Sequence, residues 1–315
     1  MRGFPAGGVP SRGSWWRLAL ALIVFMLWAH PSLVGLPCAA LLIVAPDRSG
    51  RSVPLAALIG IASLGLLFLL DSAGSRLAAV TSAYIVLVTV AFVASTLLRP
   101  APLLRQALRA TAIAVVATAV LIQVIWGTDG WGVLAWEATR QSSFMMRTVV
   151  ERAPDAFALY EPLVKFVSLT WPGMLVLQSL AGLALAWQLH LRLTSPPLGA
   201  PLAPFTTFRI GDGWVWGIVA WLGVLILPVS GALQVAGTNL GLVAGTLYVL
   251  RGAAIVVAFA EAFGVSTVTL MIAAGAAAAL ALPLLFVLPG LCTLGITDTW
   301  YQYRRRIAAR QSNAS

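Results

Sequence analysis

Charged residues are scarce in this chain of 315 residues. Asp, Glu, Lys and Arg make up 10% of it, whereas a soluble domain contains about 25% charged residues. Too few polar side chains remain to coat a water-soluble globule. The alternating ten-residue segments that a transmembrane β-barrel needs are also missing. These two absences leave an all-α, polytopic transmembrane helix bundle as the expected fold class.

Lysine, cysteine and histidine are nearly absent as well. Lys165 is the single lysine, and the two cysteines, Cys38 and Cys292, lie inside apolar segments, where small buried side chains are expected. Two such residues cannot form a disulfide framework or a metal cluster. His30 and His190 stand at the ends of apolar runs, where a polar tip reaches water. The sequence therefore predicts neither a metal site nor another cofactor.

Catalytic motifs are missing too. The chain has no Walker loop, no nucleophile elbow and no zinc-binding helix. No pair of carboxylates lies within one apolar run, as general acid–base catalysis would require. The residue constellation of an intramembrane peptidase is not found either. We therefore expect a protein that is not an enzyme, and an enzyme acting on lipid is only the third hypothesis for its function.

The net charge of +10 is a property shared with nucleic-acid-binding proteins, but its distribution differs from theirs. The arginines are spread through the short connections between apolar runs, where the positive-inside rule places them in membrane proteins. No basic patch is interleaved with exposed aromatic residues, as a nucleic-acid surface would require. We therefore expect the lipid bilayer, and not nucleic acid, to be the partner of this charge.

Hydrophobic residues make up 60% of the chain, and its mean hydropathy is +0.94. They form long blocks, and a straight membrane span needs about 20 of them in a row. The apolar runs cover residues 15–29, 33–45, 53–70, 77–98, 108–126, 167–189, 214–234, 238–260 and 267–297. Pro283 and Pro289 interrupt the last run, which forms two crossings if it folds at Pro283.

The distribution of Arg and Lys favours ten crossings, with both termini cytoplasmic. In that arrangement 14 of these residues lie on the cytoplasmic side and 5 on the outer side, as the positive-inside rule requires. Eight crossings are the alternative, with the first two runs merged and the last run crossing once. The location expected from this pattern is a bacterial cell membrane.

Three polar regions flank or interrupt the apolar runs. Residues 1–14 are expected to form a disordered cytoplasmic tail, and residues 304–315 a basic cytoplasmic tail, on either side of a transmembrane bundle of residues 15–303. The longest polar stretch is residues 127–166, in which Pro154 and Pro162 are expected to separate amphipathic helices on the outer face. A structural cap and a lid over a binding cavity are its two interpretations.

Arg251 is the most informative single residue. It lies about 13 residues into the otherwise apolar segment 238–261. An arginine near the middle of a bilayer costs at least about 2.5–3.5 kcal/mol, so it needs a partner or water. Asp298 is the candidate partner by charge, and backbone carbonyls of a proline-broken neighbour are the other option. Glu261 would be about 15 Å away along the same helix, too far for contact.

Glycines accompany this arginine on its helix. At 100° per residue, Gly241, Gly245, Tyr248 and Gly252 fall on one side, and Arg251 flanks them. The spacing of Gly241 and Gly245 predicts a face that packs tightly against another helix.

Polar residues within the apolar segments indicate two functions. Asn239 falls on the side of its helix opposite to these glycines, so Asn239 and Arg251 form no single polar stripe. The first hypothesis is a transport-type protein that binds a small molecule within the bundle. The alternative is a structural or interaction protein that recruits an envelope or cytoplasmic partner without any substrate. The candidate intramembrane polar or binding residues are Arg251, Asn239, Tyr248 and Asp298.

Four groups of motifs occur in order along the chain. They are Trp171-Pro172-Gly173-Met174 with His190-Leu191-Arg192; residues 204–209 with Asp212-Gly213-Trp214-Val215-Trp216; Asn239 with Leu247-Tyr248 and residues 251–255; and Gly295 to Arg304, which ends in an aromatic and arginine-rich sequence. This order resembles the YybS-like family, bacterial multi-pass membrane proteins that are classified as a domain of unknown function.

The resemblance implies a bacterial inner-membrane protein. The YybS-like family is loosely similar in fold to the substrate-binding (S) subunits of energy-coupling-factor transporters, which implies a small-molecule ligand or a partner membrane subunit. Those S subunits usually dock on their partner through an Ala-x-x-x-Ala motif in the first helix, and residues 18–25 lack it.

Overall fold

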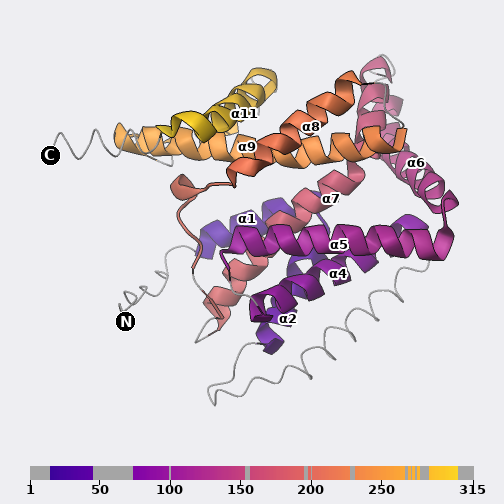
Figure 1. Ribbon diagram of the computed structural model, residues 1–315, viewed down its shortest axis with the longest axis horizontal. Helices are drawn as coiled ribbons and strands as arrows, with labels where there is room; N and C mark the ends of the chain where they lie inside the picture. The colour runs from indigo at the N-terminus through magenta and orange to yellow at the C-terminus, as the bar shows by residue number, and fades with distance from the viewer. Residues whose placement is uncertain are drawn as a thin grey trace. The chain divides into compact units, whose positions relative to one another are not determined.

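The computed structural model describes residues 15–44, 74–98, 101–152, 157–194, 198–199, 201–227, 231–266, 269–270, 272–273, 275–276 and 284–303. All regular structure in these ranges is helical (Figure 1), which confirms the all-α prediction for this part of the chain. The predicted tails, residues 1–14 and 304–315, and the predicted segment 53–70 lie outside it.

Within the described residues, four helices are long and apolar enough to cross a membrane, as a helical membrane protein requires. They are α4 (Arg76–Leu98), α5 (Leu103–Trp126), residues Glu161–Leu193 of α7 (Phe157–Leu193) and α9 (Gly231–Ala262). The other elements are α1 (Trp15–Trp28), α2 (Ser32–Val44), α6 (Asp129–Arg152), the 3-10 turns η3 (Phe205–Thr207) and η4 (Asp212–Trp214), α8 (Val215–Ile226) and α11 (Leu284–Tyr301).

The chain divides into two compact units, which are described separately. The first unit contains α1, α2, α4, α5, α6 and most of α7. Its core is formed by buried side chains from α1, α2, α4, α5 and α7, among them Leu41, Ile85, Phe92 and Leu183. Helices α2 and α7 approach closely at Gly182, where a Cβ atom would lie 2.7 Å from the carbonyl oxygen of Leu33.

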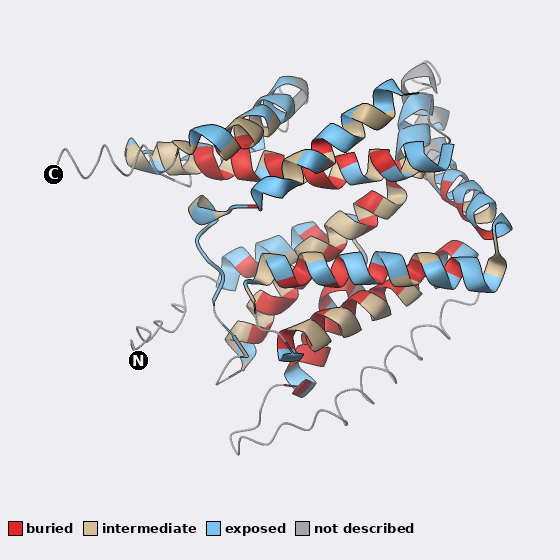
Figure 2. Ribbon diagram, in the orientation of Figure 1, coloured by how far each residue is buried: buried red, intermediate tan, exposed pale blue. Residues whose placement is uncertain are grey.

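Helix α5 has two apolar faces, one packed in the core of the first unit and one on its surface. Small residues on one face, including Ala107, Ala110 and Ala114, are buried where α5 packs beside α4 (Figure 2). The other face exposes Val116 and Val124. An exposed apolar face of this kind is unfavourable in water and is typical of a surface that contacts lipid.

Helix α6 is joined to the start of α4 by one carboxylate. Glu137 accepts hydrogen bonds from the Ser75 hydroxyl (2.6 Å) and from the backbone N–H of Leu77 (2.7 Å). A negative charge at a helix N-terminus is stabilised by the helix dipole. Burial by itself raises the pKa of the Glu137 carboxyl, but these hydrogen bonds and the charge of Arg76 outweigh it and hold the pKa below its ordinary value.

The predicted boundary at Pro162 is wrong. Helix α7 runs without a break for 37 residues, through Pro162, so the second half of the predicted insertion is continuous with the apolar run that follows. Pro162 removes only one backbone hydrogen bond near the start of the helix, which a long apolar helix tolerates. Helix α6 ends at Arg152, and Pro154 lies outside the described residues.

The second unit contains η3, η4, α8, α9, α11 and residues 172–174. The predicted run 214–234 is wrong at its C-terminal end, since α8 stops at Ile226 after 12 residues and α9 then begins at Gly231 and continues for 32. Leu227 has the extended conformation (φ −83°, ψ 143°) that the residue before a proline favours. Pro283 lies outside the described residues, whereas Pro289 lies inside α11 and does not interrupt it as predicted.

Both α8 and α11 pack against α9 (Figures 1 and 2). The contact with α8 depends on Gly237 and Gly241, because Cβ atoms there would collide with Val224 and with the ring of Trp221. Gly241 therefore packs as tightly as its spacing predicts, whereas a Cβ at Gly245 would meet no atom of the described residues within 4 Å.

The contact with α11 is closer still. A Cβ on Gly252 of α9 would collide with the carbonyl oxygen of Leu291, and a Cβ on Gly295 of α11 would collide with the carbonyl oxygen of Tyr248. Each glycine thus lies directly against the backbone of the other helix. This reciprocal contact lets the two backbones approach at a distance that no larger residue allows.

We expect Gly252→Ala and Gly295→Ala each to lower the free energy of unfolding by about 1–3 kcal/mol, because the added methyl group forces the two backbones apart. Thermal unfolding of the purified protein in detergent measures this. Gly245→Ala is the matched control on α9, where alanine is expected to be neutral or to stabilise by up to about 1 kcal/mol. Equal stability of all three variants would contradict the close contact.

Candidate functional site

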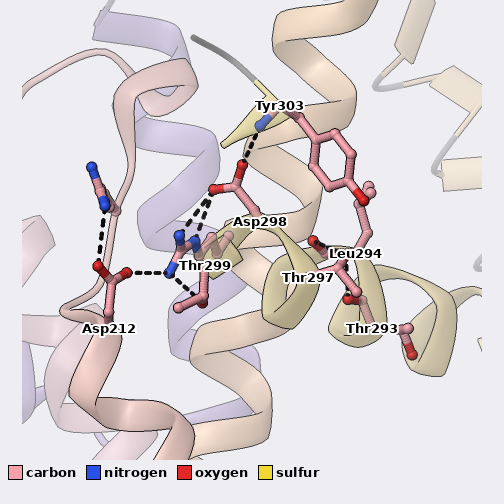
Figure 3. Close-up of polar contacts among 9 residues, drawn as sticks. Asp212, Thr293, Leu294, Thr297, Asp298, Thr299 and Tyr303 are labelled. Atoms are coloured by element: carbon pink, nitrogen blue, oxygen red, sulfur yellow. Dashed lines mark hydrogen bonds and ion pairs between the residues drawn. The ribbon is translucent and has the colours of Figure 1, made fainter. Parts of the chain in front are cut away.

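Arg251 of α9 is the largest fully buried side chain among the described residues, with no exposed surface. Its guanidinium contacts the side chains of Asp212, Asp298 and Thr299 from two other elements, and Figure 3 labels these three residues. Nε donates a hydrogen bond to Oδ2 of Asp298 at 3.0 Å, and Nη2 lies 3.0 Å from the same oxygen. Nη1 donates to Oγ1 of Thr299 at 3.2 Å and to Oδ1 of Asp212 at 3.4 Å.

Asp298 is the buried carboxylate of this network, with a side chain that is 4% exposed. Its Oδ1 accepts a hydrogen bond from the backbone N–H of Tyr303 at 3.0 Å, just beyond the end of α11. Its own carbonyl accepts one from Gln302 at 3.1 Å. Gln302 has a φ of +47°, a left-handed conformation that is common where helices end. Asp298 therefore pairs with Arg251 and also fixes the end of α11.

Asp212 is the second carboxylate and differs from the first in exposure. It lies at the start of η4, and half of its side-chain surface is exposed. Its Oδ2 also accepts a hydrogen bond from Nη2 of Arg209 at 3.2 Å. The network therefore contains two cations and two carboxylates, so that its formal charges balance.

The glycine contact between α9 and α11 positions the buried pair. Gly252 follows Arg251 directly, and Gly295 precedes Asp298 by three residues, about one helical turn. Because the two backbones touch at these glycines, the arginine and the carboxylate face each other at hydrogen-bonding distance. The short distance between Arg251 and Asp298 thus depends on the glycines beside them.

Tyr248 is the third predicted residue that the structure brings into this region. It is fully buried on α9, about one turn before Arg251. Thr299 lies beside its hydroxyl, but no hydrogen bond of ordinary geometry joins that hydroxyl to a described residue. The structure therefore collects three of the four predicted site residues, Tyr248, Arg251 and Asp298.

Asn239, the fourth predicted residue, lies elsewhere on α9. It is twelve residues before Arg251, which corresponds to about 18 Å along the helix. Its Oδ1 accepts a hydrogen bond from the backbone N–H of Gly173 at 2.6 Å, and its Nδ2 donates to the carbonyl of Val235 at 2.8 Å. Asn239 and Arg251 therefore belong to separate polar contacts in the structure, as their positions along the helix predict.

Two members of the network were not among the predicted site residues. Asp212 lies 39 residues before Arg251 at the edge of an apolar run, and Thr299 is one of many threonines in apolar segments. Both lie within motifs that carry the YybS-like resemblance, residues 212–216 and 295–304, but nothing in those motifs singles out either side chain. Among the described residues, no group of three His, Cys, Asp or Glu side chains is placed to hold a metal ion.

Comparison with protein-family models, with curated proteins and with solved structures finds no match to this chain. Function is therefore inferred from the network itself and from the motifs in the sequence.

Replacing the buried arginine should be far more harmful than replacing an exposed one. Arg251→Leu leaves the Asp298 carboxylate buried without its cation, which costs about 3–5 kcal/mol. We expect a large loss of folding yield or a fall in Tm of at least about 5 °C. Arg251→Lys should also be destabilising, because an ammonium group cannot reproduce the planar contacts of the guanidinium.

The matched control is Arg147→Leu. Arg147 forms an exposed pair with Glu151 on α6 (2.8 Å), and such surface pairs contribute about 0–1 kcal/mol. Thermal unfolding and expression yield compare the variants directly. If Arg251→Leu unfolded at the same temperature as wild type, the arginine would not be a buried partner of Asp298.

Proposed function

We propose that this chain is a bacterial multi-pass membrane protein of the transport type that binds a small molecule within its helix bundle. The observation that supports this is the Arg251 network, in which a guanidinium fully buried on α9, a helix of membrane-spanning length, meets the carboxylates of Asp298 on α11 and Asp212 in η4. Ionisable groups in membrane helices are costly and mark binding or translocation sites in many membrane proteins. Apolar side chains of similar volume often stabilise a bundle as well as a buried ion pair does, so stability alone is a weak reason for the network.

The YybS-like resemblance supports the same proposal. Tyr248, Arg251, Asp212 and Asp298, which form or flank the network, all lie in the motifs that carry it. It also motivates the proposed location, the bacterial inner membrane. The missing Ala-x-x-x-Ala motif in the first helix argues against assembly with an energy-coupling-factor partner in the usual way.

We further propose ten membrane crossings, with both termini cytoplasmic. Asp212 stands at the start of α8 and Asp298 near the end of α11, and both contact the same guanidinium. An even number of crossings between these two residues brings them to the same side. Residues 267–297 must then cross twice, as in the ten-crossing arrangement, because a single crossing would separate the two carboxylates.

Cysteine accessibility tests this topology. We expect Ser312→Cys to resist a membrane-impermeant thiol reagent added to intact cells, and to react once the cells are opened. Ser142→Cys, in the segment proposed to face outward, is the matched control that should react from outside. Labelling of Ser312→Cys in intact cells would contradict the proposed topology.

The rival function is a structural or interaction protein without a substrate. Helix α6 supports it, since Trp131, Trp136 and Phe144 are exposed on a helix that carries many polar residues. A surface of this kind suits contact with another protein or with lipid head groups. Direct detection of a bound molecule separates the two functions.

Native mass spectrometry of the full chain, released from mild detergent, is the test. The transport-type function predicts a retained small molecule that adds a constant mass to the protein and is lost on unfolding. A protein mass without any adduct other than lipid, from cells grown in rich medium, would contradict the proposal and favour the rival.

A further inference from the structure

The two carboxylates on Arg251 hold it with different strength. Asp298 is 4% exposed and lies 3.0 Å from both Nε and Nη2. Asp212 is half exposed and reaches only Nη1, at 3.4 Å. Hydrogen bonds weaken with such lengthening, and charge-assisted ones are ordinarily about 2.7–2.9 Å. The contact between Asp212 and Arg251 is therefore the one that can open while the rest of the network stays intact.

Release of Asp212 leaves no buried charge without a partner. Asp298 still neutralises Arg251, because their contacts do not involve Nη1. Arg209 still pairs with Asp212 through its other oxygen, Oδ2, at 3.2 Å. The cost that normally prevents the breaking of a buried ion pair, an unpaired charge in an apolar environment, is thus absent for this contact.

Two hydroxyl groups lie near the Nη1 atom of Arg251 that Asp212 Oδ1 contacts. Nη1 of Arg251 lies 3.2 Å from Oγ1 of Thr299, whose hydroxyl accepts from it and retains its own proton to donate. The fully buried hydroxyl of Tyr248 lies beside Thr299 and makes no hydrogen bond of ordinary geometry with a described residue. A buried hydroxyl of this kind is stabilised when a further acceptor arrives.

We propose that the Nη1 side of Arg251, with the hydroxyls of Thr299 and Tyr248, binds the carboxylate group of a small molecule, which replaces the carboxylate of Asp212. This inference rests on the proposed function and names the substrate class of the same site. Asp212 is the internal model for the ligand, because its own carboxylate occupies the position. When the ligand binds, Asp212 stays paired with Arg209, and when the ligand leaves, Asp212 returns to Arg251.

The charge of the network favours a carboxylate over a phosphate. Asp298 already places one negative charge 3.0 Å from the guanidinium. A carboxylate adds one further charge, the same number that Asp212 contributes. A phosphate dianion would add two beside a buried carboxylate, where the repulsion of like charges is weakly screened.

Chemical rescue tests the proposal. Asp212→Ala removes the internal carboxylate, and acetate supplies the missing group in solution. In detergent at pH 7, we expect 100 mM sodium acetate to raise the Tm of Asp212→Ala by about 2–4 °C relative to sodium chloride of equal ionic strength. Inorganic phosphate at equal ionic strength should have no such effect.

Two matched controls show whether the rescue is specific. Wild type should be nearly insensitive to acetate, because free acetate competes poorly with the tethered carboxylate of Asp212, whereas a larger ligand gains further contacts. Glu151→Ala, which removes an exposed carboxylate paired with Arg147, should be equally insensitive. If the Asp212→Ala protein cannot be purified in chloride, Asp212→Asn replaces it, with a smaller rise expected because the amide still fills part of the site. Absence of an acetate effect in the folded Asp212 variant, or an equal effect in all proteins, would overturn the carboxylate site.

The second readout separates this inference from the proposed function. A ligand retained by wild type in native mass spectrometry, together with failed rescue, would leave the transport-type function standing and reject the carboxylate site. Successful rescue, together with no ligand retained by the protein purified from cells, would support the carboxylate site and contradict the proposed small-molecule binding. Tyr248→Phe with Thr299→Val should reduce the rescue, because both hydroxyl donors are lost while the shape of the side chains is kept.

Discussion

A guanidinium enclosed by apolar helices is stable only while a carboxylate stays within hydrogen-bonding distance, and the second unit is built around this requirement. Taking either charge out of water costs several kcal/mol, which good geometry must offset. The geometry comes from Gly252 and Gly295, whose missing side chains let α9 and α11 touch beside the pair. Asp298 in turn binds the backbone of Tyr303 and so holds the end of α11.

The same requirement explains how the network divides into a tight and a loose part. The buried pair of Arg251 and Asp298 is complete without further help, so the contact of Asp212 adds a second carboxylate to a cation that is already neutralised. Because Asp212 is half exposed and has Arg209 as its own partner, the contact can open without a large electrostatic cost. A stable ion pair and an exchangeable position therefore coexist on one guanidinium, which is the arrangement that a small-molecule binding site needs.

Much of the helical architecture could be predicted from the sequence, because long apolar runs can form little other than helices. The runs at 15–29, 33–45 and 77–98 match α1, α2 and α4 closely. One error is the run 214–234, which the structure divides between α8 and α9. The others lie at Pro162 and Pro289, where a proline costs one hydrogen bond but does not end a helix that is otherwise stabilised. A local pattern cannot show which prolines the surrounding helix will tolerate.

The site was predictable in part for a similar reason. An arginine in the middle of an apolar segment implies a partner, and Asp298 was the available acid on another segment. The contact of Asp212 could not be predicted, since it depends on how a 3-10 turn meets the side of α9. The role of Gly295 likewise depends on its contact with the backbone of α9, at Tyr248. Packing between helices determines both the Asp212 contact and the close approach at Gly295, and a local sequence pattern does not predict that packing.

A double-mutant cycle on Arg251 and Asp298 tests this account most directly. The free energy of unfolding is measured in mixed micelles for Arg251→Leu, for Asp298→Leu and for the variant that carries both changes. The buried pair predicts that the double variant is more stable than either single variant, with a coupling energy of at least about 2 kcal/mol. Losses that simply add in the double variant would show that the two side chains do not interact, and would contradict the network on which the proposed site depends.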